Sequence, residues 1–121
     1  MKLRLEENML RLRLSNDELT EFAKSGHLTY SLRLGADNSA AQCLTYALET
    51  VPELPSDTAL VANKAAALNL VATAGCITIK LAASAAQNWL ESAQNSITAQ
   101  IDVGTEAPLR VIVEKDLGYQ H

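Results

Sequence analysis

The chain has 121 residues, of which 48% are hydrophobic and 20% are charged, as in globular domains rather than disordered segments. A formal net charge of −4 and an aromatic content of 4% disfavour nucleic-acid binding, which usually needs a basic surface and stacking rings. We therefore expect residues 1–121 to fold as a single domain that does not bind nucleic acid.

The first residues alternate charged side chains with leucine, so they lack the apolar stretch of a signal peptide. The least polar segment, residues 59–86, is interrupted by asparagines and lysines and is not expected to span a bilayer. These features predict a cytoplasmic protein that does not enter a membrane. In that reducing compartment Cys43 and Cys76, which lack a CxxC spacing, are expected to be free structural thiols.

Two alternating segments open the chain. Leucines alternate with polar residues over 2–6 and 10–14, a pattern typical of two strands that each have one apolar face. The Glu7-Asn8 pair between them favours a tight turn, so the two segments are predicted to form a hairpin. Ser15 and Glu18 then have the spacing of a capping box, which predicts that a helix begins after Ser15.

The predicted helix is followed by two more strands. Gly26 predicts the helix end, since glycine readily adopts the left-handed conformation common after a helix C-terminus. Alternation resumes over 28–34 and 44–48, with a loop rich in Gly, Asp, Asn and Ser at 35–39. Residues 1–49 therefore predict a β-β-α-β-β unit.

The same order of elements returns when the chain is shifted along itself by 67 residues. The last strand of the first unit, 44–48, corresponds to 109–113 after a slip of a residue or two. We interpret this as two tandem β-β-α-β-β repeats, 1–49 and 68–116, with a linker at 50–67 and a tail at 117–121. The aligned positions include Leu3 with Leu70, Leu5 with Ala72, Leu10 with Ile77, Leu12 with Ile79, Leu14 with Leu81, Phe22 with Trp89, Tyr30 with Ile97, Leu32 with Ala99 and Leu34 with Ile101.

Two local features of the second half are less regular. Ser84 replaces the capping box and predicts the start of a helix that runs to about Glu91. In the linker, Pro52 and Pro55 exclude a continuous strand. Residues 56–67 fit either a short alanine-rich helix or an extension of the following strand, and the sequence leaves both open.

The apolar faces of these elements predict an α+β fold. The helices should cover the Leu/Ile faces of the strands, which gives one largely antiparallel eight-stranded sheet or open barrel with two helices. Phe22 and Trp89 occupy matching helix positions and are predicted core anchors. Tyr30 and Tyr46 are in phase with apolar strand positions, which predicts buried rings with hydroxyl groups near the rim.

Basic side chains are the most patterned polar feature. They alternate with the apolar residues, so they belong to the opposite strand face and form a positive surface that could attract phosphate or carboxylate. A solvated sheet face that deters aggregation explains the same pattern, and we prefer that interpretation. A closed sheet would turn these residues into a tunnel, but metal-binding tunnels need several carboxylates, and only Glu6 and Glu114 lie on strands. The basic strand residues are Lys2, Arg4, Arg11, Arg13, Arg33, Lys80 and Arg110.

The sequence contains no recognisable catalytic or metal-binding motif. His27 and His121 are isolated, the glycines form no phosphate loop, and the cluster at 114–116 reads as a solvated strand end. We therefore predict no cofactor or metal, and favour a non-enzymatic binding or protein-interaction module. An anion- or phosphate-binding protein or small enzyme with a pocket between the repeats, and a homodimer formed through a sheet edge, are the alternatives. The candidate ligand-binding residues are Arg4, Arg11, Arg13, Arg33, Arg110 and Glu114.

Several short segments resemble an uncharacterised family of small bacterial proteins. They are MKLRL at 1–5, RLRLS at 11–15, LTYALE at 44–49 and VEKD at 113–116. The similarity extends over nearly the whole chain. It implies a bacterial origin and supports the predicted fold, and because no activity is established for that family it assigns no functional residue.

Overall fold

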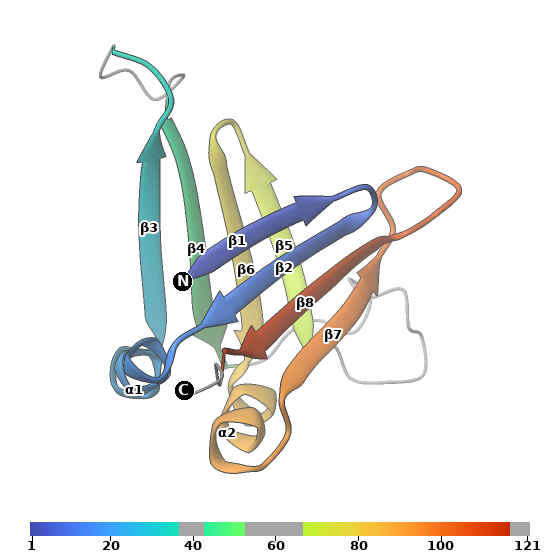
Figure 1. Cartoon of the computed structure of the whole chain (residues 1–121). Coiled ribbons are helices and arrows are strands. Elements are labelled where there is room, and N and C mark those ends of the chain that lie inside the picture. Colours follow the sequence, from blue (N-terminus) through green and yellow to red (C-terminus); the bar gives the residue numbers. More distant parts are fainter. Residues whose placement is uncertain (37–42, 53–66, 117–121) are drawn as a thin grey trace.

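The computed structural model describes residues 1–36, 43–52 and 67–116, which form an α+β fold as predicted (Figure 1). The helix-or-strand question for residues 56–67 lies outside the described residues, apart from Ala67. The elements are β1 (Lys2–Glu6), β2 (Met9–Leu14), α1 (Asn16–Ser25), β3 (His27–Arg33), β4 (Cys43–Val51), β5 (Leu68–Thr73), β6 (Cys76–Ala82), α2 (Ala83–Glu91), β7 (Ser96–Ile101) and β8 (Leu109–Lys115).

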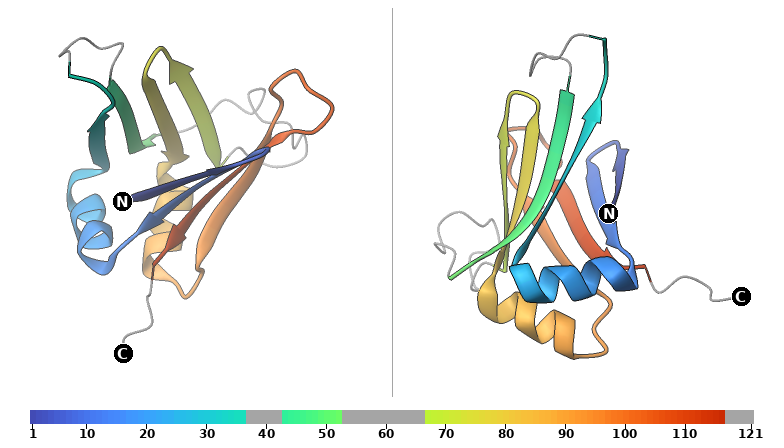
Figure 2. Two further views of the ribbon diagram at one scale, coloured as in Figure 1. Left: turned by 45° about the horizontal axis from the view of Figure 1, so that its top comes forward. Right: turned by 90° about the vertical axis from the view of Figure 1, so that its left-hand side faces the viewer.

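The strands divide into two four-stranded sheets, so the predicted single eight-stranded sheet or open barrel is not what forms. The first sheet has the order β1-β2-β8-β7 and the second sheet has the order β3-β4-β6-β5. In each, two antiparallel hairpins are joined by a central parallel pair, β2 with β8 or β4 with β6. The two sheets face each other and splay apart at one end (Figure 2). Two stacked sheets bury both apolar faces, which a single open sheet with only two helices to cover it cannot do.

Each sheet therefore combines a hairpin from residues 1–49 with a hairpin from residues 68–116. Backbone hydrogen bonds beyond the strand ends reinforce the joins. The Arg110 amide donates to the Asn8 carbonyl at 2.9 Å, and the Asp116 amide donates to the Leu14 carbonyl at 2.7 Å. In the second sheet the Thr45 amide donates to the Gly75 carbonyl at 2.7 Å.

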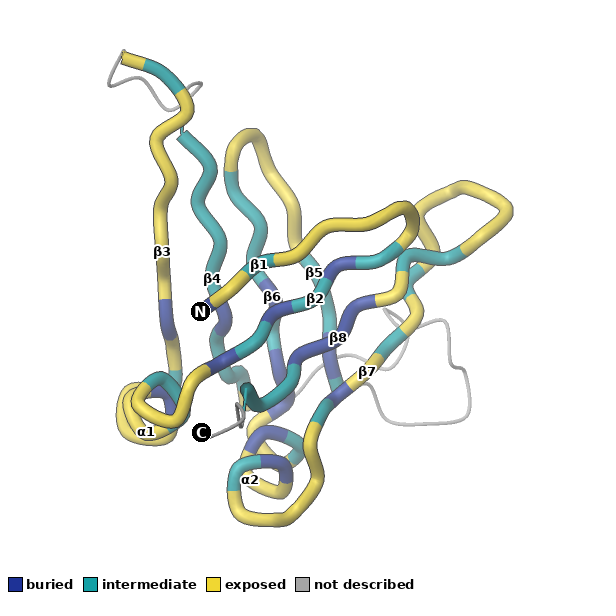
Figure 3. Tube along the Cα trace, in the orientation of Figure 1, coloured by how far each residue is buried: buried dark blue, intermediate teal, exposed yellow. Residues whose placement is uncertain are grey.

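The core lies between the inner faces of the two sheets. Leu12 opposes Val113 in the first sheet and Leu48 opposes Ile79 in the second, and all four are at most 1% exposed. Buried positions concentrate on the inner strands rather than on the edge strands β1 and β3 (Figure 3). This is where burial of apolar surface contributes most of the stability.

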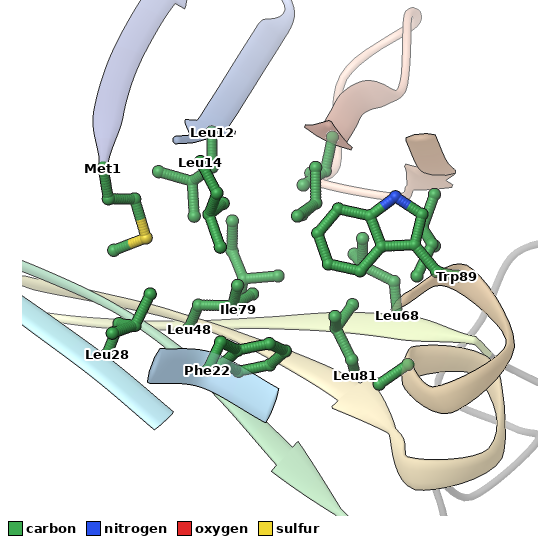
Figure 4. Close-up of a cluster of buried hydrophobic side chains, with 14 of the residues drawn as sticks. Met1, Leu12, Leu14, Phe22, Leu28, Leu48, Leu68, Ile79, Leu81 and Trp89 are labelled. Atoms are coloured by element: carbon green, nitrogen blue, oxygen red, sulfur yellow. The ribbon is translucent and has the colours of Figure 1, made fainter. Parts of the chain in front are cut away.

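Both helices lie at the same end of the sheets and add an aromatic ring to this core (Figures 1 and 4). Phe22 from α1 is 1% exposed and Trp89 from α2 is fully buried, which confirms both predicted anchors. The Trp89 indole also donates to the Asn95 carbonyl at 3.0 Å, so its buried N–H group has a partner.

The helix N-termini differ from each other. The predicted capping box of α1 is confirmed: the Glu18 amide donates to the Ser15 hydroxyl at 3.3 Å, and the Ser15 amide donates to the Glu18 carboxylate at 2.9 Å. The prediction that Ser84 caps α2 is wrong. Strand β6 leads directly into the helix at Ala83, so the N-cap is Ala82, and it makes no side-chain hydrogen bond.

The prediction of two buried tyrosine rings is wrong for Tyr30. This residue lies on the edge strand β3, where no described strand covers it on one side, and it is 37% exposed. Tyr46, on the inner strand β4, is half-buried and its hydroxyl donates to the Met1 carbonyl at 2.9 Å. The two rings stack with centroids 5.9 Å apart.

A substitution at Gly26 should destabilise the fold. Gly26 ends α1 with φ of 78°, and an added Cβ would lie 2.9 Å from the Thr50 hydroxyl oxygen. We expect Gly26→Ala to lower the free energy of unfolding by about 1–2 kcal/mol from backbone strain, with a further loss from the contact. Urea denaturation measures the change.

Gly104→Ala is the matched control for this contact. Gly104 has φ of 84°, but an added Cβ would meet no described atom within 4 Å. It should therefore show the backbone strain alone. An equal loss in both variants would contradict a role for the Thr50 contact.

Candidate functional site

The outer face of the first sheet gathers most of the basic strand residues. Lys2 opposes Arg13 and Arg4 opposes Arg11 across the β1–β2 hairpin. Arg110 follows on β8, beside Met9. We call this surface the basic face. It consists of Lys2, Arg4, Arg11, Arg13 and Arg110, together with the carboxylates of Glu6 and Glu114.

The basic face points away from the core. Leu3 and Leu12 oppose each other on the inner side of the same hairpin, and the two sheets are not closed into a barrel. The question left open by the sequence, whether these residues face outward or line a cavity, is settled in favour of the outer face. A tunnel lined by them is excluded.

Arg33 lies apart from the other candidates. It is on the edge strand β3 of the second sheet, opposite Cys43, and it is exposed. Five of the six candidate residues predicted from the sequence therefore share one surface. Arg33 does not, because sequence alternation assigns a residue to a strand face but not to a particular sheet.

Glu114 binds the two arginines of β2. Arg13 donates from Nε to Oε2 at 2.8 Å, and its Nη2 lies 2.7 Å from the same oxygen. The Arg11 Nε lies 3.7 Å from Oε1, which is too far for a hydrogen bond. The Glu114 side chain is 14% exposed, so this carboxylate is largely enclosed between the two guanidinium groups.

The Arg11 guanidinium is incompletely satisfied. Its Nε is buried and has no hydrogen-bond partner in the part of the chain that the structure describes. Ile112, directly opposite Arg11 on β8, is only 5% exposed although it lies on the outer face.

A pocket of about 370 Å³ opens on the basic face beside β1. Its lining is formed by Lys2, Leu3, Arg4, Arg11 and Arg13. Guanidinium groups bind carboxylates and phosphates with two parallel hydrogen bonds, and lysine adds a mobile point charge. These lining residues offer positive charge and hydrogen-bond donors, which suit the binding of an anion.

The predicted solvated strand end at residues 114–116 is wrong for Glu114. Glu114 is enclosed by arginines, and Lys115 donates to the Ser92 carbonyl at 2.8 Å and lies 5.9 Å from the centroid of the Trp89 ring. Asp116 lies 3.7 Å from the Lys2 ammonium. The sequence did not indicate these contacts because the partners of residues 114–116 are distant in sequence.

Glu18 holds the start of β1 in place, a role that the sequence did not indicate beyond the capping box. Its carboxylate pairs with the Met1 ammonium and accepts a hydrogen bond from the Tyr30 hydroxyl at 2.6 Å. Burial lowers the pKa of the Met1 ammonium, and the charge of Lys2 lowers this pKa further. These contacts fix the residue that precedes Lys2 and so position one end of the basic face.

The cysteines and the possible metal ligands do not form a second site among the described residues. Cys43 and Cys76 are free, half-buried thiols on the second sheet. Within residues 1–36, 43–52 and 67–116, no three His, Cys, Asp or Glu side chains lie close enough together to hold a metal ion. A second hollow of about 460 Å³ lies between the helices, with a mostly apolar lining that includes Phe22 and Leu90 and one carboxylate, Glu91.

Residues 1–119 match the model of a family of unknown function, DUF7009. Because the match covers nearly the whole chain, the chain belongs to this family, and its resemblance to an uncharacterised family is confirmed. No curated protein and no solved structure matches the chain significantly. None of the described helices is long and apolar enough to cross a membrane.

Glu114→Gln should destabilise the first sheet while preserving the shape of the side chain. Removing the carboxylate leaves the partly buried Arg11 and Arg13 without their charged partner. We expect the free energy of unfolding to fall by about 1–3 kcal/mol, measured by urea denaturation.

Glu6→Gln provides the control on the same face. Glu6 pairs with Arg4 at 2.8 Å, but its side chain is 44% exposed, and such surface pairs contribute little. Its effect should stay below about 0.5 kcal/mol. An equal loss of unfolding free energy in the two variants would show that the enclosure of Glu114 does not strengthen its ion pairs with the arginines.

Proposed function

We propose that this member of DUF7009 is a non-enzymatic binding module that binds an anionic ligand through the basic face. The observation that carries this proposal is the Arg11 side chain, whose buried Nε has no hydrogen-bond partner among the described residues although Arg11 lines a pocket. Arg11 is paired with the Glu114 carboxylate at 3.7 Å, but a buried N–H donor without a hydrogen bond is unfavourable, and an oxyanion bound beside Arg11 could supply that hydrogen bond.

Unbalanced charge supports the same function. Within the described residues the basic face carries five basic side chains and two carboxylates, with a third carboxylate, Asp116, 3.7 Å from Lys2, in a chain of net charge −4. Lys2 opposes Arg13 and Arg4 opposes Arg11, and like charges directly across a strand pair repel each other. A ligand that brings negative charge to the hairpin relieves this repulsion.

The basic face draws residues from both halves of the chain, whereas the pocket on it is lined by residues of the first half. Arg11 and Arg13 come from residues 1–49 and Glu114 comes from residues 68–116, and β2 pairs directly with β8. The lining of this pocket is four basic residues and one leucine, which supports the binding of an anion.

We propose further that the two halves arose by duplication and form one domain in the bacterial cytoplasm. Support comes from the strand orders of the two sheets. In the proposed repeat, β1, β2, β8 and β7 correspond to β5, β6, β4 and β3. This substitution converts the order of the first sheet, β1-β2-β8-β7, into β5-β6-β4-β3, which is the order of the second sheet read from its other edge. The two free cysteines are consistent with a reducing compartment. The experiments on the basic face do not depend on these points.

Tripolyphosphate is a suitable first probe because it presents several oxyanions to the clustered arginines. We expect it to bind the purified protein at low ionic strength, with heat detected by titration calorimetry and weaker binding as salt is added. Arg11→Gln and Arg13→Gln should each weaken binding by about tenfold, the effect of losing one charge-assisted hydrogen bond.

Arg33→Gln is the control, since it removes the same charge from the second sheet. It should leave the affinity within about twofold of the wild type, because only long-range attraction changes. An equal loss from Arg33→Gln and Arg11→Gln would mean that net charge, and not the basic face, governs binding. Absence of binding to tripolyphosphate and to citrate would refute the proposed function.

A further inference from the structure

The edge strand β1 combines three features that a partner strand could use together. It ends the first sheet, and no described strand pairs with its outward side. Lys2 and Arg4 project from its outer face with side chains 80% and 64% exposed. Leu5 projects from the opposite face and is 59% exposed, among the most exposed large apolar residues of the described chain.

We propose that β1 receives an extended acidic protein segment, which adds to the first sheet as a further antiparallel or parallel strand. The inference rests on the proposed function and names the ligand class for the same surface. An unpaired edge offers backbone N–H and C=O groups in alternation, which an extended peptide can match with its own.

The side chains of β1 specify the pattern of the segment. Residues of an added strand alternate between the two faces of the sheet, as those of β1 do. Positions on the outer side would meet Lys2 and Arg4 and therefore favour Asp or Glu. Positions on the inner side would lie beside Leu5 and favour an apolar residue. The segment is thus expected to alternate acidic and apolar residues.

The neighbouring strand strengthens this selection. Arg11 and Arg13 stand directly behind Arg4 and Lys2 on β2, and the pocket lies against the same residues. A carboxylate on the added strand would therefore reach β1 first and could extend into the pocket toward Arg11. The repulsion within the hairpin favours an acidic occupant over an apolar or basic one.

A second copy of this chain fits the edge less well. Two molecules paired through β1 would bring two basic faces edge to edge, which adds repulsion where the acidic segment adds attraction. The edge strand β3 of the second sheet also exposes an apolar residue, Leu32 at 53%, but Arg33 is the one basic strand residue there. This makes β3 a natural comparison for β1.

The test uses a synthetic peptide of about eight residues that alternates Glu and Val, the length of an ordinary strand. Two control peptides have the same composition: one groups the Glu and Val residues in blocks, and the other carries N-methyl groups on every second amide. Fluorescence anisotropy of labelled peptides gives the affinities. We expect the alternating peptide to bind at least about tenfold more tightly than either control, since N-methylation removes several backbone hydrogen bonds.

Two protein variants test the location. Leu5→Thr should weaken binding of the alternating peptide by about fivefold or more, and Leu32→Thr should not change it, because both replace an exposed leucine on an edge strand but only Leu5 lies on β1. Neither should change binding of tripolyphosphate. In the complex, hydrogen exchange of the β1 amides should slow.

The outcomes separate this inference from the proposed function. If all three peptides bind equally and only Arg11→Gln weakens them, the basic face is a purely electrostatic site, and strand addition is overturned while the proposed function stands. Failure of the alternating peptide to bind, with tripolyphosphate still bound, overturns it in the same way. Concentration-dependent self-association that Leu5→Thr abolishes would identify a second copy as the occupant and also overturn it.

Discussion

The two central parallel strand pairs, β2 with β8 and β4 with β6, are the interactions on which the rest of the structure depends. Each joins segments that are far apart in the sequence and aligns buried residues such as Leu12 with Val113 and Leu48 with Ile79. Without these pairs, neither half of the chain could build a sheet wide enough to cover the apolar face of the other. The β2–β8 pairing also places Glu114 beside Arg13, so the interaction that forms the first sheet also assembles the basic face.

Features set by neighbouring residues could be predicted from the sequence. Ser15 and Glu18 cap a helix because their spacing alone brings the two groups together, and Gly26 ends it because its backbone adopts a positive φ. Features set by strand pairing could not be predicted. Alternation placed Arg33 and Arg11 on outer strand faces, but nothing local showed that these faces belong to different sheets.

The proposed repeat illustrates the same limit. The shift of 67 residues matched Tyr30 with Ile97. In the sheets, however, Ile97 is paired with Val113, and the equivalent pair in the second sheet is Leu28 with Leu48. The structural counterpart of Ile97 is therefore Leu28 and not Tyr30. The strand after each helix is therefore offset by two residues, which preserves the apolar phase and so leaves no trace in the pattern. This offset explains why Tyr30, matched with a buried isoleucine, is instead exposed on an edge.

Comparison of the two sheets separates the charges required by the fold from those available for binding. Arg13 opposes Glu114 in the first sheet, and Lys80 opposes Glu49 at the corresponding place in the second, so one basic and one acidic residue recur at this central position. The other basic residues do not recur. The counterparts of Lys2, Arg4 and Arg11 are Asn69, Val71 and Thr78. A four-stranded sheet of this architecture forms without those three charges, and solvation of an outer face does not require them. Their concentration on a repelling hairpin therefore supports the proposed binding of an anionic partner.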